Sequence, residues 1–265
     1  MIDAREDQAA GLRRLFRQRP PTVVAFYATG ARRAHNALVA AHRIAGQREK
    51  VLLLDEAAGD EALGDALGLA PGPDLLQMLD GRLTLAELLQ PAPGLFGRIP
   101  AAAAALALPL LDDARRACLI EAIRVLHRHA GFVLIHAGQD SAEDPSPFVL
   151  AAPQRLLVAE ASAIGATEAY RIIKQLAAAG AGSLHLAVAR AHGVTDARNF
   201  FTSLQSLVRH HVGVPLVWLG EIERDDLAAG LTRTPSSSAA REAGALFLRR
   251  LEGMNADAWR TGAFG

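Results

Sequence analysis

Short apolar runs alternate with stretches of helical periodicity along most of the chain. The runs that predict strands lie at residues 23–28, 50–55, 132–135, 155–159, 184–189 and 214–219. Apolar residues that recur every three to four positions predict helices before Gly46 and at residues 56–69, 75–79, 83–89, 113–129, 166–179, 195–211 and 238–251. Most of the strands are apolar throughout, which is typical of strands buried on both faces. The pattern therefore predicts an α/β fold, a mostly parallel sheet with helices on both faces.

The first strand, its loop and the helix that follows form the most informative unit. In a parallel sheet such a loop lies at the carboxyl edge, where ligands bind. A phosphate-binding loop would be rich in glycine, with a lysine for the phosphate and a Ser or Thr for magnesium. Here the loop contains Gly30, lacks lysine, and continues into Ala34 and His35. The position suits phosphate, but the expected side chains are absent.

A separate amphipathic segment precedes the sheet. Acids come first and arginines last in residues 3–18, an order that suits the helix dipole. An apolar stripe runs along the segment, and Pro20 and Pro21 end it. We therefore expect three parts: a helix in residues 1–19, an α/β domain in residues 20–253 and a tail in residues 254–265. The helix can pack on its own domain or bind a partner groove.

Composition excludes several classes of protein. The counts of Lys+Arg and Asp+Glu are equal at 28, so no overall field favours nucleic acid, and we expect no nucleic-acid partner. The single cysteine, Cys118, excludes a disulfide framework and fits a reducing cytoplasm. No apolar stretch is long enough for a membrane span, and the first residues lack the order of a secretion signal.

Three stretches resemble the MinD/ParA class of ATPases, and within it the flagellar number regulators FlhG, FleN and MotR. Residues 7–15, DQAAGLRRL, are similar to the DQAxxLR element at the start of those regulators. Residues 50–55 are similar to the strand that follows their phosphate loop. Residues 167–174, TEAYRIIK, are similar to a TDAYxxIK helix, and residues 219–222 follow it in the same order. The resemblance implies a MinD-like P-loop fold preceded by a short helix.

The chain differs from this family at the positions that bind and hydrolyse nucleotide. Thr29 and Ala34 stand in place of two lysines, His35 in place of the magnesium-binding threonine, and His136 in place of an aspartate. Asp55 matches the family. The resemblance thus implies a vestigial nucleotide site made of Thr29, Gly30, Arg32, Arg33, Ala34, His35, Asp55 and His136. We expect a pseudo-ATPase with no catalytic residue, no cofactor and no metal, and leave weak ATP or ADP binding open.

The resemblance also implies partners. In the family the N-terminal helix binds and stimulates FlhF, a GTPase related to those of the signal recognition particle. The residues that would form this contact here are Asp7, Gln8, Ala9, Leu12, Arg13 and Phe16. Further expected partners are flagellar switch-complex proteins or transcriptional activators. The expected location is the cytoplasm, and binding to partners could bring the protein to the cell pole or the membrane surface.

Several alternatives stay open at this stage. Arg32 and Arg33 could replace the lysines in a working ATPase switch, or form a solvated helix entry. His35 and His136 could hold a metal, but two histidines without a third ligand favour hydrogen bonding instead. A pole- or pilus-localising pseudo-ATPase would share the fold without needing the N-terminal helix. Membrane contact by the C-terminal helix is also open. A dinucleotide dehydrogenase is disfavoured, because no GxGxxG follows the first strand.

Overall fold

The computed structural model describes residues 21–46, 49–138, 145–181, 184–232 and 237–254 of the chain. Its strands are β1 (Thr22–Ala28), β2 (Val51–Asp55), β3 (Gly97–Pro100), β4 (Phe132–His136), β5 (Gln154–Glu160), β6 (Leu184–Ala189) and β7 (Leu216–Glu221). They form one seven-stranded sheet in the order β3-β2-β4-β1-β5-β6-β7, and every pairing is parallel. The predicted parallel α/β fold is confirmed.

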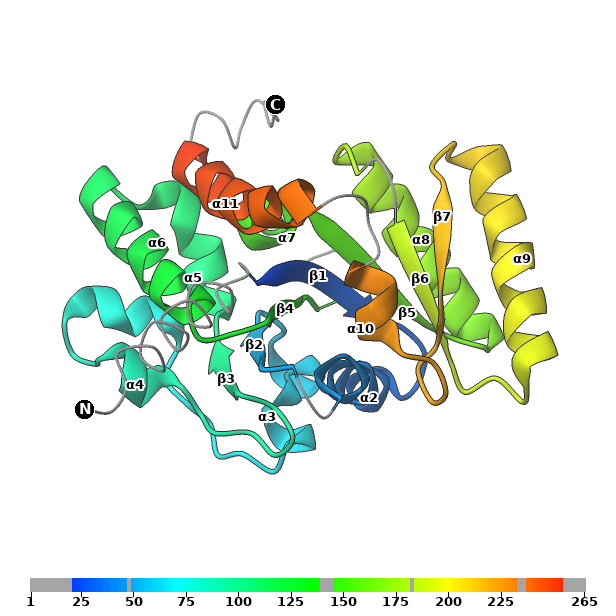
Figure 1. The fold of residues 1–265 in the computed structure, drawn as a ribbon, viewed down its shortest axis with the longest axis horizontal. Coiled ribbons are helices and arrows are strands. Elements are labelled where there is room, and N and C mark those ends of the chain that lie inside the picture. Colours follow the sequence, from blue (N-terminus) through cyan, green and yellow to red (C-terminus); the bar gives the residue numbers. More distant parts are fainter. Residues whose placement is uncertain (1–20, 47–48, 139–144, 182–183, 233–236, 255–265) are drawn as a thin grey trace, which may run out of the picture.

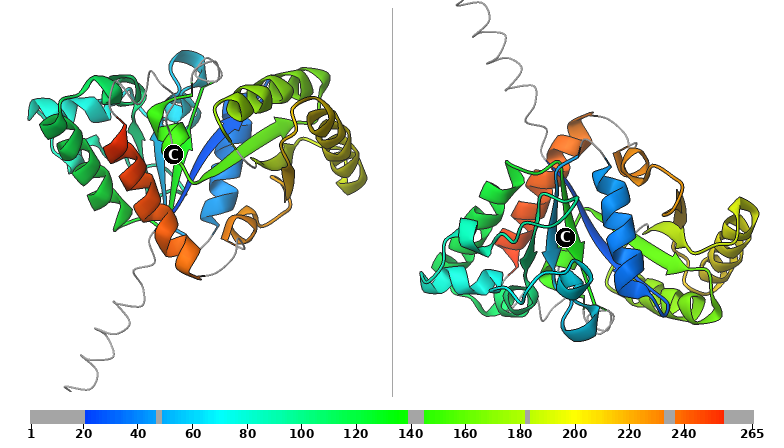
Figure 2. Two further views of the ribbon diagram at one scale, coloured as in Figure 1. Left: turned by 90° about the horizontal axis from the view of Figure 1, so that it is seen from above. Right: turned by 90° about the horizontal axis from the view of Figure 1, so that it is seen from below.

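Helices cover both faces of this sheet (Figures 1 and 2). One face packs against α5 (Ala102–Ala107), α6 (Asp113–His127), α7 (Pro147–Ala151), α8 (Ala163–Ala178), α9 (Val194–His211) and α11 (Ser237–Gly253). The other packs against α2 (Arg33–Ala45), α3 (Leu63–Ala66) and α10 (Leu227–Thr232). Two separate apolar clusters, one on each face, account for the uniformly buried central strands.

The segment between β2 and α6 departs most from prediction. Helical spacing predicted one helix at residues 56–69, but this region holds a loop, the 3-10 turn η1 (Gly59–Glu61) and the single turn α3. The two short helices predicted around Gly81 are confirmed as η2 (Leu75–Asp80) and α4 (Leu85–Leu88), and α5 leads into η3 (Leu108–Leu110). The strand β3 and the helices α7 and α10 were not predicted.

The ends of the β1–α2–β2 unit match prediction. α2 ends at Ala45, and Gly46 follows with φ 50°, a conformation that favours glycine. β1 lies in the middle of the sheet, between β4 and β5. The loop after β1 is therefore placed at the centre of the carboxyl edge. No helix in the described ranges is long and apolar enough to cross a membrane.

The predicted domain boundaries at residues 19 and 253 stay predictions. Residues 1–20 and 255–265 lie outside the described part of the chain.

Candidate functional site

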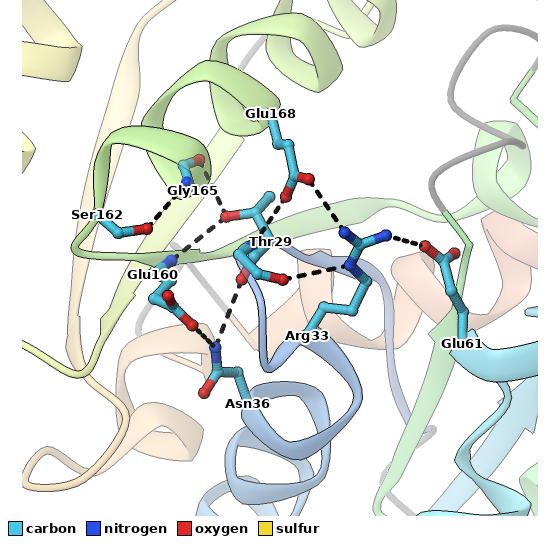
Figure 3. A network of polar contacts seen from close by, with 9 residues as sticks. Thr29, Arg33, Asn36, Glu61, Glu160, Ser162, Gly165 and Glu168 are labelled. Carbon is cyan, nitrogen blue, oxygen red and sulfur yellow. Dashed lines mark hydrogen bonds and ion pairs between the residues drawn. The ribbon is translucent and has the colours of Figure 1, made fainter.

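The loop that joins β1 to α2 is held by an acid from α8. The Gly30 N–H donates to Oε2 of Glu168 at 2.7 Å, across 138 positions of sequence. The backbone N–H of such a loop is the group that would approach a phosphate oxygen. Here a carboxylate of the same chain accepts that hydrogen bond. Figure 3 shows Glu168 reaching down from α8 to the loop.

Arg33, the first residue of α2, is also bound by acids. Its Nη1 lies 2.6 Å from Oε1 of Glu61, and its Nη2 lies 3.1 Å from Oε1 of Glu168 (Figure 3). Its Nε donates to the Gly30 carbonyl at 3.3 Å. Glu168 thus accepts from both the loop backbone and the guanidinium. We call Gly30, Arg33, Glu61 and Glu168 the carboxylate cluster.

A second network fixes the base of the loop against β5. The Thr29 hydroxyl donates to the Gly165 carbonyl at 3.1 Å and accepts from the Glu160 N–H at 3.3 Å. The buried Asn36 amide donates to Oε2 of Glu160 at 3.2 Å. Ser162 caps α8 by accepting from the Gly165 N–H. These contacts tie β1, α2 and α8 together beneath the carboxylate cluster (Figure 3).

Both the backbone conformation at position 30 and the close contacts around it require glycine. Its φ is +91°, which L side chains rarely adopt. A Cβ at this position would lie 2.5 Å from the Cβ of Glu160. The side chain of Glu160, at the end of β5, therefore lies directly against the loop at Gly30.

Asp55 at the end of β2 is buried, and its carboxylate accepts hydrogen bonds from several groups. Its Oδ2 accepts from Nε of Arg98 and from the Leu63 N–H, both at 2.8 Å, and its Oδ1 lies 2.9 Å from Nδ1 of His136. Burial acts to raise the pKa of Asp55, but the hydrogen bond and charge of His136 and the charge of Arg98 together lower the pKa. Asp55 is a structural anchor for β3, β4 and α3 rather than a free carboxylate at the sheet edge.

Glu56, the next residue, has a different environment. Its carboxyl group is buried and accepts a hydrogen bond from the Ser146 hydroxyl at 2.7 Å. Burial raises the pKa of Glu56 to about 8, and the charge of Asp55 adds to this, against the effect of Ser146. The two neighbouring acids thus have separate partners, as expected for adjacent residues at a strand end.

The residues predicted for the vestigial site do not all come together. Arg32 and His35 are exposed, whereas His136 is buried against Asp55 and the ring of Phe26. The predicted hydrogen-bonding role of His136 is confirmed. In the described ranges no group of three or more His, Cys, Asp or Glu is placed to hold a metal.

The predicted partner-binding residues Asp7, Gln8, Ala9, Leu12, Arg13 and Phe16 lie outside the described residues. The acids at the loop, Glu61, Glu160 and Glu168, were not singled out from the sequence. Glu168 reaches the loop because β5 pairs with β1 and α8 follows β5, and this strand order is not visible in the sequence.

A cavity lies away from the loop. Its volume is ≈ 860 Å³, it lies between α2 and α10, and its walls include Ile44, Phe132 and Ala229 but no residue of the β1–α2 loop. It is at the end of α2 opposite that loop.

These residues do not fit a nucleoside triphosphate with Mg²⁺. Such a ligand needs cations and N–H donors that can turn towards phosphate. The described loop contains no lysine, and Gly30 and Arg33 already bind carboxylates. At an effective dielectric constant of about 20, a carboxylate about 5 Å from a phosphate charge opposes binding by about 3 kcal/mol.

The fold is that of the ParA and MinD ATPases. A ParA family ATPase from Chlorobium tepidum TLS superposes with a TM-score of 0.53 at 17% identity, covering 92% of this chain and 99% of that one. The MinC:MinD cell division protein complex of Aquifex aeolicus contains a chain that matches with a TM-score of 0.52 at 21% identity, covering 87% and 96%. At these identities the solved structures establish the fold alone.

The chain is also similar to the antiactivator FleN of Pseudomonas aeruginosa PAO1. The two are 28% identical over 178 residues, which is 67% of this chain and 64% of FleN, less than two thirds of its length. No protein family model matches the chain. The predicted resemblance to the MinD/ParA class and its FleN-type members is confirmed.

Proposed function

We propose that this protein is a regulator of flagellar number and placement that acts through protein contacts and not through ATP hydrolysis. The similarity to the antiactivator FleN supports the flagellar role. One observation supports action without ATP hydrolysis. Glu168 accepts a hydrogen bond from the Gly30 N–H and forms an ion pair with Arg33, so an acid is bound to the loop. Phosphoryl transfer requires positive charge at this place, whereas the loop has no lysine and Arg33 is already paired with carboxylates.

The N-terminal segment is the proposed contact with an FlhF-like GTPase. Its motif, residues 7–15, supports this by resemblance, and Gln8 and Leu12 belong to the predicted contact face. The α/β domain would contact a transcriptional activator or a flagellar switch-complex protein, in keeping with the name antiactivator carried by FleN. Any association with the cell pole or membrane surface would follow from these partners.

GTP hydrolysis by a purified FlhF-like GTPase tests the partner contact. Adding this protein should raise the hydrolysis rate, and Gln8→Ala with Leu12→Ala should remove the increase. The control changes Arg14→Ala with Gln18→Ala, in the same segment but outside the predicted face, and should keep the increase. Equal stimulation by the wild type and the Gln8/Leu12 variant would rule out the contact. The protein would then fit a pole- or pilus-localising role instead.

Calorimetry with Mg-ATP tests the proposal that the protein does not act through ATP hydrolysis. We expect no heat of binding at millimolar nucleotide, because the acids bound to the Gly30 N–H and to Arg33 would have to be displaced, and the exposed Arg32 alone does not replace two lysines and Mg²⁺. Micromolar binding by the wild type would refute the proposal. It would favour an ATP-dependent switch in which Arg32 and Arg33 take the part of the lysines.

A further inference from the structure

We propose that Glu61 and Glu168 are built-in anionic ligands of the β1–α2 loop, which replace phosphate and cover a latent anion-binding site. This inference rests on the proposed function, since it explains how the loop keeps its conformation without nucleotide. It concerns the carboxylate cluster: Figure 3 shows Arg33 between Glu61 and Glu168, and the Gly30 N–H donates to Glu168.

The cluster joins three segments that are remote in sequence. Arg33 opens α2, Glu61 lies on η1 after β2, and Glu168 lies on the first turns of α8. A bound phosphate would make the same type of link, by accepting from the loop N–H and from a cation at once. Glu168 does both, with Oε2 on the Gly30 N–H and Oε1 on Arg33.

The named side chains of the cluster carry an excess of negative charge. Arg33 supplies one positive charge, and Glu61 and Glu168 supply two negative charges. The three side chains are partly shielded, with exposed fractions of 34%, 21% and 18%. An incoming anion would therefore have to displace two acids that are held at hydrogen-bond distance. Removing those acids takes one carboxylate from the Gly30 N–H and two carboxylates from the Arg33 guanidinium.

The decisive variant is Glu61→Ala with Glu168→Ala, and the probe is inorganic pyrophosphate in calorimetry. We expect roughly 100-fold tighter binding than by the wild type, about tenfold for each carboxylate removed, because solvent and salt screen these partly exposed charges and reduce the repulsion below the unscreened value of about 3 kcal/mol each. Adding Arg33→Ala to this variant should abolish the gain. The matched control is Glu121→Ala with Glu252→Ala, which removes the two acids paired with the exposed Arg124. It should bind no better than the wild type.

A second measurement holds even if the double variant is unstable. Glu168→Ala alone removes the acceptor of the Gly30 N–H, so amide exchange at Gly30 should accelerate by about tenfold while exchange in β4 is unchanged. Unchanged exchange at Gly30, or a folded double variant that binds pyrophosphate no better than the control, would overturn the inference. Those results would leave the proposed function standing, whereas nucleotide binding by the wild type would refute that function directly.

Discussion

Glu56 is a buried carboxyl group whose proton is linked to stability. Its pKa is raised from 4.5 to about 8 by burial, so the folded state holds the proton at pH values where the unfolded chain releases it. Stability contributed by this group is therefore present below pH 4.5 and is lost as the pH rises through about 8. The loss is at most about 1.4 kcal/mol per pH unit in that window.

Glu56→Gln should remove this dependence, because the amide stays neutral and still accepts from Ser146. We expect the variant to be more stable than the wild type above pH 8 and nearly equal to it near pH 4.5. Urea denaturation across this range measures the difference. Glu121→Gln, at an exposed position of α6, is the control and should leave the pH profile of the wild type unchanged. Parallel profiles for Glu56→Gln and the wild type would contradict the assignment.

At the scale of elements, Asp55 joins β2 to its neighbours. Arg98, on β3, is buried, and both its Nε and Nη2 bind Oδ2 of Asp55. Asp55→Ala should destabilise the fold by about 3–5 kcal/mol, since it leaves the guanidinium buried without its anion. Adding Arg98→Met should recover part of this loss, because the remaining uncompensated charge is removed.

Urea denaturation of the two single variants and the double variant measures this coupling. Strictly additive losses would show that the pair does not hold β3 against β2. Arg115→Ala provides a comparison, because its pair with Asp112 is exposed and should contribute at most about 1 kcal/mol.

The elements that sequence predicted are those with a strong periodicity. The central strands are apolar throughout, and α6, α8, α9 and α11 show long helical repeats, so their type and order were correct. β3 was missed because its four residues include Gly97 and Pro100, which are typical of loops. Residues 56–69 have helical spacing, but Asp55 holds the Leu63 N–H and the chain forms only short turns there.

The candidate site was predicted only in part, for a physical reason. The residues of the loop are contiguous, so the missing lysine was visible in the sequence. Glu168 is separated from Gly30 by 138 positions, and the two meet because β5 pairs with β1. Local pattern carries no information on such a contact. The sequence leaves Arg33 either as a lysine substitute or as a solvated residue at the helix entry, and in the structure it is paired with Glu61 and Glu168.

At the scale of the whole molecule, stability should not depend on nucleotide. A ligand at 100 times its dissociation constant stabilises a protein by about 2.7 kcal/mol. Because the Gly30 N–H and Arg33 already bind Glu168, Mg-ATP should leave the melting temperature unchanged, as measured by circular dichroism. A MinD/ParA-class ATPase with its loop lysines intact serves as the positive control. A rise of several degrees for this protein would contradict the expectation.

The carboxylate cluster also bears on how this protein can change over generations. Its acids come from η1 and α8, and the arginine they bind comes from α2. A lysine placed at Ala34 would leave Glu168 on the Gly30 N–H, so under the proposed function this single substitution should not restore nucleotide binding. Because the acids come from two further segments, changes at three separate places in the sequence would be needed together. The proposed function is therefore protected against reversal by any one substitution.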